Sequence, residues 1–234
     1  MKKIIIVLAL FLSIGIVNAQ NPSNSIENQD LKLAKELVSK KEYEKAMEHF
    51  KKAADSGDIT SIFAIGYMYY NGYGVSKDYN EAIKWYKKSY EKNKDNKGAI
   101  SMIAKMYYKG EGVTKDIAEA LKWYKKNLEI DENDTECMLI IAEIYCTTGE
   151  DKVRSVSEGI EWYKKATNKG NEEALLELAN VYYTIGKYSE SLIWYKKAYE
   201  AGFEEVKDTI ADIYKNGLGD VEKDIKLAEE WHNK

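Results

Sequence analysis

Apolar residues recur three and four positions apart along most of the chain, which is the spacing of one face of an α-helix. One recurring pattern is an aliphatic residue, a small residue, two variable residues and Tyr, as in Ile65-Gly66 followed by Tyr69. In a second pattern a small residue precedes the tetrad Trp-Tyr-Lys-Lys by three positions, as in Ala82 and Trp85. The alternation typical of strands is absent, so the sequence predicts an all-α protein.

The two patterns alternate and repeat. The small residues of the first pattern are Ala34, Gly66, Ala104, Ala142, Ala179 and Ala211. Those of the second pattern are Ala46, Ala82, Ala120, Gly159, Ser191 and Ala228. Each unit predicts two helices that approach closely at the small residues. One such pair cannot bury its aromatic residues alone, so stacked pairs are expected to share a continuous core, with the Lys pairs on the solvated face. About six repeats are expected, at approximately residues 28–57, 58–95, 98–133, 135–170, 171–202 and 203–234.

The turns between paired helices differ among repeats. Repeats two and three have Gly-x-Gly-Val, at residues 72–75 and 110–113. Gly adopts the left-handed conformation that such a reversal needs, and Val75 and Val113 are expected to fold the loop onto the helices. Repeat four has Thr-Gly-Glu at residues 148–150 instead, and repeats one and five have shorter turns.

The first 19 residues have the features of a secretory signal peptide. Lys2 and Lys3 precede an apolar stretch at residues 4–17, and Ala19 ends the segment. An uncleaved membrane anchor is the alternative, but this stretch is shorter than the roughly 20 residues that cross a bilayer. We therefore expect a short polar linker at residues 20–27 and an exported protein, periplasmic or secreted, without a membrane attachment after cleavage.

The charge balance argues against a nucleic-acid partner. The 234-residue chain has 35 Lys and Arg against 39 Asp and Glu, and Arg154 is its single Arg. Phosphate and base recognition favour Arg, so we expect no nucleic-acid binding. Two His and two Cys leave little for a metal site or a disulfide framework.

Residues 61–89 and 99–127 resemble Sel1-like repeats. The shared features are the aliphatic–small–x–x–Tyr run, the Gly-x-Gly-Val loop, the following Asp78 or Asp116, and the Ala-x-x-Trp-Tyr helix. Repeats one and five resemble the related tetratricopeptide repeats. The resemblance covers about residues 26–234 and implies a right-handed α-solenoid of about six repeats, whose first helices line a concave surface. It implies a scaffold or adaptor for protein or peptide partners, and the family includes secreted bacterial members.

In such a stack the first helix of each pair faces inward. Three positions of this helix are then expected on the concave face. They lie three residues before, one residue after and four residues after its small residue. The partner-binding candidates on this line are Phe63, Tyr67, Tyr70, Lys105, Tyr108, Leu139, Glu143, Leu176, Asn180 and Tyr183. Two interpretations of the tyrosines remain open. They bind a peptide or protein segment at low entropic cost, or they pack against one another and the neighbouring helix.

We expect no catalytic residue, cofactor or metal. The loop glycines follow helices and not strands, unlike those that bind nucleotides. Ser89 and Lys92 have the Ser-x-x-Lys spacing of penicillin-interacting enzymes, but Ser89 stands where Ala recurs in other repeats, which favours packing. A penicillin-binding or β-lactamase-like envelope hydrolase is the alternative that the family resemblance implies, and it is associated with a cysteine-rich branch.

Three further residues carry expectations. Cys137 and Cys146 lie nine positions apart on one predicted helix, about 13.5 Å apart along its axis, which is too far for a disulfide. Cys137 is expected to be buried, whereas Cys146 falls on the inward line and is a candidate reactive thiol. Trp231 either packs against repeat five, as in a monomer, or belongs to a surface for self-association.

Overall fold

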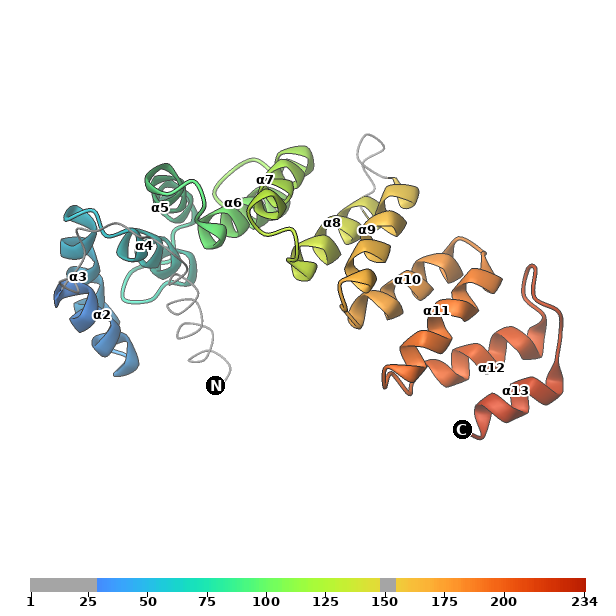
Figure 1. The fold of residues 1–234 in the computed structure, drawn as a ribbon. Helices are drawn as coiled ribbons and strands as arrows, with labels where there is room; N and C mark the ends of the chain where they lie inside the picture. Colours follow the sequence, from blue (N-terminus) through green and yellow to red (C-terminus); the bar gives the residue numbers. More distant parts are fainter. Residues whose placement is uncertain (1–28, 148–154) are drawn as a thin grey trace. The chain divides into compact units, whose positions relative to one another are not determined.

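The computed structural model describes residues 29–147 and 155–234, and within these ranges the chain forms twelve helices and no strand (Figure 1). The first helices of the six pairs are α2 (Gln29–Ser39), α4 (Ile59–Asn71), α6 (Lys97–Lys109), α8 (Thr135–Thr147), α10 (Glu173–Thr184) and α12 (Val206–Asn216). The second helices are α3 (Tyr43–Asp55), α5 (Tyr79–Lys92), α7 (Ile117–Ile130), α9 (Val156–Asn168), α11 (Tyr188–Glu200) and α13 (Ile225–His232). The predicted all-α solenoid of helical repeats is confirmed. The expected signal peptide, the linker and the turn at residues 148–150 lie outside the described residues.

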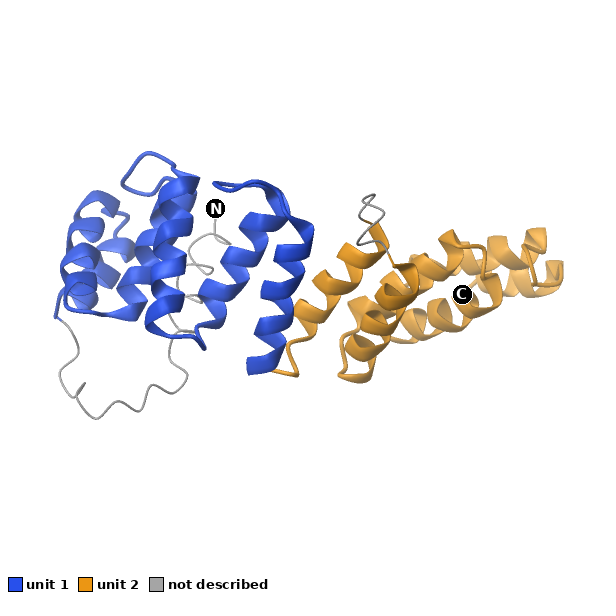
Figure 2. Ribbon diagram, turned by 90° about the horizontal axis from the view of Figure 1, so that it is seen from above, with its two compact units in different colours: residues 1–130 blue, residues 131–234 orange. Residues whose placement is uncertain are grey.

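The chain divides into two compact units, residues 1–130 (unit 1) and residues 131–234 (unit 2), which Figure 2 shows in different colours. The described part of unit 1 contains α2 to α7, and unit 2 contains α8 to α13. Within each unit the helices of a pair pack on each other and on the following pair. No helix among the described residues has the length and apolarity that a bilayer crossing needs.

The loop of the Gly-x-Gly-Val repeats begins and ends with defined caps. Gly72 and Gly110 end α4 and α6 with φ of 76° and 74°, the left-handed conformation expected from the sequence. The Asp that follows the loop is the N-cap of the next helix, since the carboxylate of Asp78 accepts hydrogen bonds from the backbone N–H groups of Asn80 and Glu81. Val75 and Val113 are half-buried against the cores of their repeats, as predicted.

The second glycine of each loop makes a contact that the sequence did not predict. It lies against the first residue of the second helix in the preceding repeat, and the pairs are Gly74 with Tyr43, Gly112 with Tyr79 and Gly219 with Tyr188. A Cβ on Gly112 would overlap the carbonyl group of Tyr79, and a Cβ on Gly219 would lie 2.6 Å from the ring of Tyr188. We call this the Tyr–Gly contact. It requires glycine because a Cβ would meet the backbone of the preceding repeat at Gly74 and Gly112, and the Tyr188 ring at Gly219.

The residues of the Trp-Tyr-Lys-Lys tetrad make different contacts at each position. The Tyr is buried in the four full copies, at Tyr86, Tyr124, Tyr163 and Tyr195. In repeats two, four and five the second Lys lies over the half-buried Trp ring, as Lys165 Nζ does at 4.0 Å from the centroid of Trp162. In repeats two and five the first Lys donates a hydrogen bond to a Tyr of the next repeat, as Lys196 Nζ does to Tyr214 Oη at 2.9 Å.

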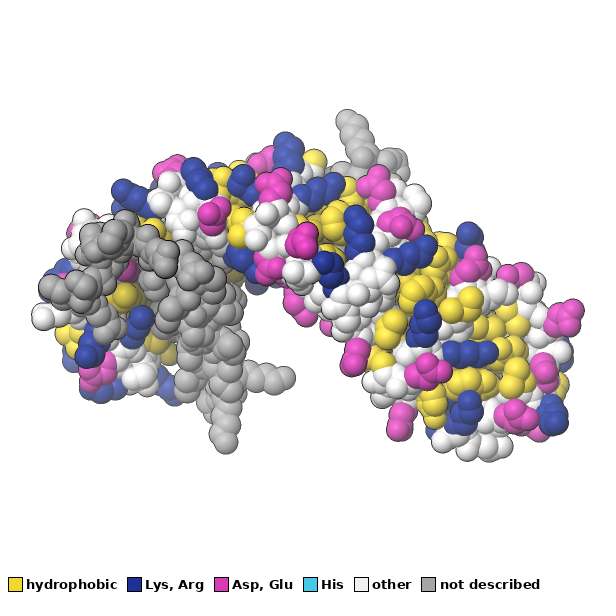
Figure 3. Space-filling model, viewed as in Figure 1, with side chains coloured by type: hydrophobic (Ala, Val, Ile, Leu, Met, Phe, Trp, Pro, Cys, Tyr) yellow, Lys and Arg dark blue, Asp and Glu magenta, His cyan; other side chains and the backbone are white. Residues whose placement is uncertain are grey.

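The expectation that both lysines simply face solvent was therefore incomplete. Their ammonium groups contact aromatic side chains, either over a Trp ring or at a Tyr hydroxyl. Figure 3 shows Lys side chains lying among hydrophobic ones on the C-terminal unit.

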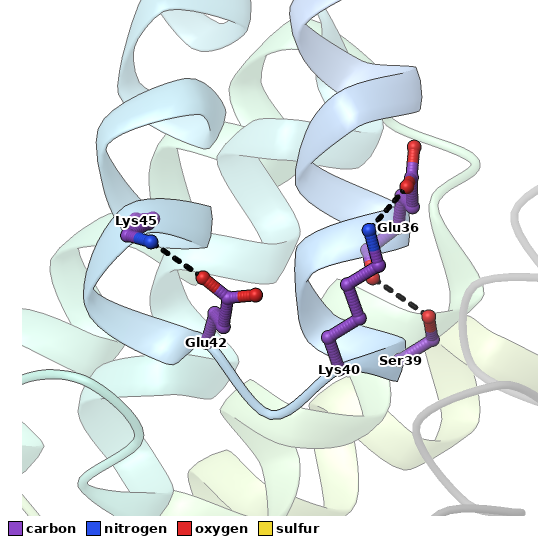
Figure 4. A network of polar contacts seen from close by, with 5 residues as sticks. All are labelled: Glu36, Ser39, Lys40, Glu42 and Lys45. Carbon is purple, nitrogen blue, oxygen red and sulfur yellow. Dashed lines mark hydrogen bonds and ion pairs between the residues drawn. The ribbon is translucent and has the colours of Figure 1, made fainter.

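The first described repeat has a polar turn between its helices. Around the α2–α3 turn Lys40 pairs with Glu36 at 2.6 Å and Lys45 pairs with Glu42 at 2.6 Å, while the Ser39 hydroxyl donates to the Glu36 carbonyl (Figure 4). These side chains are exposed, so the ion pairs contribute little to stability.

The last repeat resolves the alternative for Trp231. Its ring is only 7% exposed and makes an edge contact with Tyr199 of α11, with 5.3 Å between ring centroids. Trp231 therefore packs against repeat five.

Candidate functional site

The predicted concave residues of α4 pack largely against other aromatic rings. Phe63 is buried, and its ring centroid lies 5.3 Å from that of Tyr86. The Tyr70 ring makes an edge contact with Tyr79 at 5.1 Å, and the half-buried Tyr67 lies 6.2 Å from the ring of Tyr73. In this part of unit 1 the rings fill the space on the first-helix side themselves.

Polar contacts also join α4 to the following repeat. The Tyr70 hydroxyl donates a 2.7 Å hydrogen bond to Glu111, and Lys105 Nζ lies 5.3 Å from the centre of the Tyr70 ring. Burial and the neighbouring Lys109 lower the pKa of Lys105, against the opposing effect of Glu111. Tyr108, also on α6, is half-buried.

Unit 2 contains a pocket of about 450 Å³ between its first helices α8 and α10, with α9 at its side. Three predicted residues line it, namely Leu139, Glu143 and Asn180. The other two predicted residues of this unit, Leu176 and Tyr183, instead pack against the core that α10 to α13 form. The predicted partner-binding residues of unit 2 therefore lie in two places, three at the pocket and two against the core.

The pocket exists because repeat four lacks the rings of repeat two. Glu143 and Cys146 stand one and four positions after the small residue, where repeat two has Tyr67 and Tyr70. The Cys146 thiol packs so close to α9 that a Cβ on Gly159 would overlap its sulfur, which explains glycine where four other repeats have Ala. Shorter side chains on α8 therefore leave unfilled the space that tyrosine rings fill in unit 1.

The walls of the pocket combine apolar and acidic side chains. Leu139, Val156, Val181 and Ile185 supply aliphatic surface from three helices. Glu143 from α8 and Glu173 and Glu177 from α10 supply carboxylates. The predicted concave positions did not include Glu173 and Glu177. The sequence does carry a signal for them, because these two Glu stand four positions apart on a largely apolar helix.

Glu177 has an unusual environment for a carboxylate. Burial raises its pKa, and the charges of Glu173 and Glu143 raise it further. A hydrogen bond from Asn180 opposes the shift. The Asn180 amide is oriented by Tyr195, whose hydroxyl donates a 2.7 Å hydrogen bond to Asn180 Oδ1 and leaves the amide N–H groups for Glu177.

Tyr163 of α9 also lines the pocket. It is 3% exposed, and burial together with the charge of Glu177 raises its pKa well above the ordinary value. Its hydroxyl is therefore a neutral polar group beside the carboxylates at neutral pH.

The described residues show no arrangement suited to a metal, because no three His, Cys, Asp or Glu side chains among them converge in a way that could hold one. Ser89, considered above for its Ser-x-x-Lys spacing, is fully buried, and its hydroxyl accepts a 2.9 Å hydrogen bond from Asn96. It fills a packing position. Cys137 is buried as expected, Cys146 is half-buried, and both are thiols.

Comparison with known proteins places this architecture. The structure of a Sel1 repeat protein from Oxalobacter formigenes is 28% identical over 92% of this chain and 89% of that one, with a TM-score of 0.61. The TPR protein YrrB, 20% identical, shares the fold over 82% of this chain and 92% of its own, with a TM-score of 0.56.

A curated relative, an uncharacterized Sel1-like repeat-containing protein from Schizosaccharomyces pombe, is 42% identical over 57 residues. That match spans 24% of this chain and 9% of the relative. The Sel1 repeat family matches six segments, at residues 35–58, 59–94, 98–126, 136–171, 173–203 and 210–234. These segments cover most of the sequence and follow the helix pairs described above, and the chain belongs to the Sel1 repeat family.

Proposed function

We propose that this protein is an exported, non-catalytic interaction scaffold that binds a peptide or protein segment on the first helices of its repeats. Repeats of the Sel1 and TPR-like fold commonly mediate protein–protein interaction. The observation that carries the proposal is the pocket of unit 2, which lies between two first helices and includes Leu139, Glu143 and Asn180. Its volume of about 450 Å³ suits the side chains of a bound segment.

Two further features support the proposal. YrrB, which shares the fold, is a TPR protein with an unusual peptide-binding site, so a peptide is a suitable class of ligand to test here. Export rests on the signal-peptide features of residues 1–19.

The binding surface is tested by filling the pocket. In Cys146→Tyr the new residue is the one that repeats two, three and five have at the same position, as Tyr70, Tyr108 and Tyr183. We expect this variant to keep its helicity. It should no longer bind the peptides that immobilised wild-type protein selects from a random library. The matched control is Ile193→Tyr, which adds a ring at an exposed position of a second helix in the same unit.

Equal peptide binding by wild type, Cys146→Tyr and Ile193→Tyr would refute the pocket as the binding surface. Export is tested separately, by expressing the full chain and sequencing the N-terminus of the protein found outside the cytoplasm. We expect it to begin at Gln20, and an intact Lys2 in all of the protein would contradict export with cleavage.

A further inference from the structure

The pocket of unit 2 has a chemistry more specific than that of a general peptide groove. On the first-helix side of unit 1, Tyr70 uses its ring and its hydroxyl for contacts within the protein. The pocket of unit 2 instead presents carboxylates beside aliphatic walls. Such walls favour an apolar stem, and carboxylates favour a positive group at its end.

The charges around Glu177 form an arrangement that is unfavourable without a ligand. Glu143, Glu173 and Glu177 come from two helices and repel one another across the pocket, and Glu177 is also half-buried. The other titratable groups that line the pocket are the Cys146 thiol and the Tyr163 hydroxyl, which are neutral or anionic and never positive. A cation placed among these groups would remove the repulsion.

A metal ion is a poor candidate for that cation. No cluster of metal-ligating side chains exists among the described residues, and several pocket walls are aliphatic. An organic cation on an alkyl chain satisfies both kinds of wall. In a peptide ligand this is a Lys or Arg side chain.

On the basis of the proposed function, we propose that the pocket between α8 and α10 selects segments that place one basic side chain in it. Its stem lies along Leu139, Val181 and Ile185, and its cationic group meets Glu177 with Glu143 and Glu173 around it. Asn180 and Tyr195 act as positioning residues. Tyr195 orients the Asn180 amide, and Asn180 in turn holds the Glu177 carboxylate by a hydrogen bond.

The test compares three random heptapeptide libraries that differ at one fixed central position. That position is Lys in the first library, norleucine in the second and Glu in the third. Norleucine has the four-carbon chain of Lys without the ammonium group. We expect the wild-type mature chain to retain the Lys library about tenfold or more over the norleucine library, the size of one charge-assisted hydrogen bond. The Glu library should bind weakest.

The matched variants are Glu177→Gln, which keeps the size and hydrogen-bonding capacity of the side chain, and Glu200→Gln at an exposed position of α11. Glu177→Gln should lose most of the preference for Lys, whereas Glu200→Gln should keep it. Occupancy has a direct readout as well, because a bound Lys peptide should slow alkylation of Cys146, the half-buried thiol that lines the pocket.

The outcomes separate this inference from the proposed function. If the Lys and norleucine libraries bind equally and Cys146→Tyr abolishes both, the scaffold stands and the cationic preference is wrong. If Glu177→Gln keeps the preference, the assigned carboxylate is wrong. If none of the libraries binds, both proposals fail.

Discussion

Gly112→Ala tests whether the Tyr–Gly contact holds successive repeats together. A Cβ at this position would overlap the carbonyl group of Tyr79, which is backbone at the start of α5 and cannot turn away. Gly112 also has φ of 71°, which L-residues rarely adopt. The substitution therefore combines backbone strain with a collision between two repeats.

Gly57→Ala isolates the first of these costs. Gly57 lies in the same unit, has φ of 89°, and a Cβ there would meet nothing within 4 Å. Its substitution should cost only the left-handed conformation, about 1 to 2 kcal/mol. Overpacking against Tyr79 should add about 1 to 3 kcal/mol in Gly112→Ala. For a chain of this size the added cost corresponds to a further fall in Tm of about 2 to 12 °C.

The assay is thermal unfolding of wild type, Gly57→Ala and Gly112→Ala under identical conditions, followed by circular dichroism at 222 nm. The difference between the two variants is the quantity of interest, because both carry the same kind of backbone strain. Equal Tm values for the variants would show that the loop moves away from Tyr79 at no cost. The contact would then be a consequence of stacking and not a reason for the second glycine.

Three other predictions follow from single contacts. Glu177→Gln should raise Tm at pH 7, because the folded-state pKa of Glu177 lies above its ordinary value of 4.5 and its charge therefore destabilises the folded state. The gain in Tm should shrink as the pH falls through the raised pKa and vanish below 4.5. A gain that is independent of pH would contradict this reasoning. Tyr214→Phe should lower stability by about 0.5 to 1.5 kcal/mol in urea unfolding through loss of the bond from Lys196, and no change would mean that the bond contributes nothing. In the native protein iodoacetamide should modify Cys146 and leave the buried Cys137 unmodified until unfolding, so mass spectrometry that finds the reverse order would refute the burial assignment.

Much of the fold could be predicted from the sequence because its determinants are local. Small residues that allow helix approach, left-handed turn glycines such as Gly72, and apolar spacing along each helix are all properties of one repeat. The Tyr–Gly contact could not be predicted in the same way, since it depends on which residue of the preceding repeat faces the loop. In retrospect a signal exists. Tyr43, Tyr79 and Tyr188 open the second helices of the repeats that precede a Gly-x-Gly or Gly-Leu-Gly loop, whereas α7 and α9 open with Ile117 and Val156.

The candidate site was predictable only in part, for a different reason. Glu143 and Asn180, which the positional rule selected, line the pocket, whereas Tyr183, which the rule treated as equivalent, packs against the core. Whether a side chain at a given repeat position faces solvent depends on its size and on which side chains of the neighbouring helices it can pack against. Tyr183 reaches the rings of Tyr188 and Tyr195 and packs there. Glu177, two positions before the small residue, lies outside the rule altogether.

These differences show how repeats of one fold come to have different first-helix surfaces. The position four residues after the small residue is Tyr in repeats two, three and five, and a ring there can reach neighbouring aromatic residues. In repeat four that position is Cys146, and the preceding inward position is Glu143, so neither side chain is large enough to close the space between α8 and α10. The same backbone therefore gives packed rings in one repeat and a pocket in another. Glu177 lies half-buried in that pocket, where its charge costs the folded state stability, and the basic side chain of the proposed ligand would offset that cost.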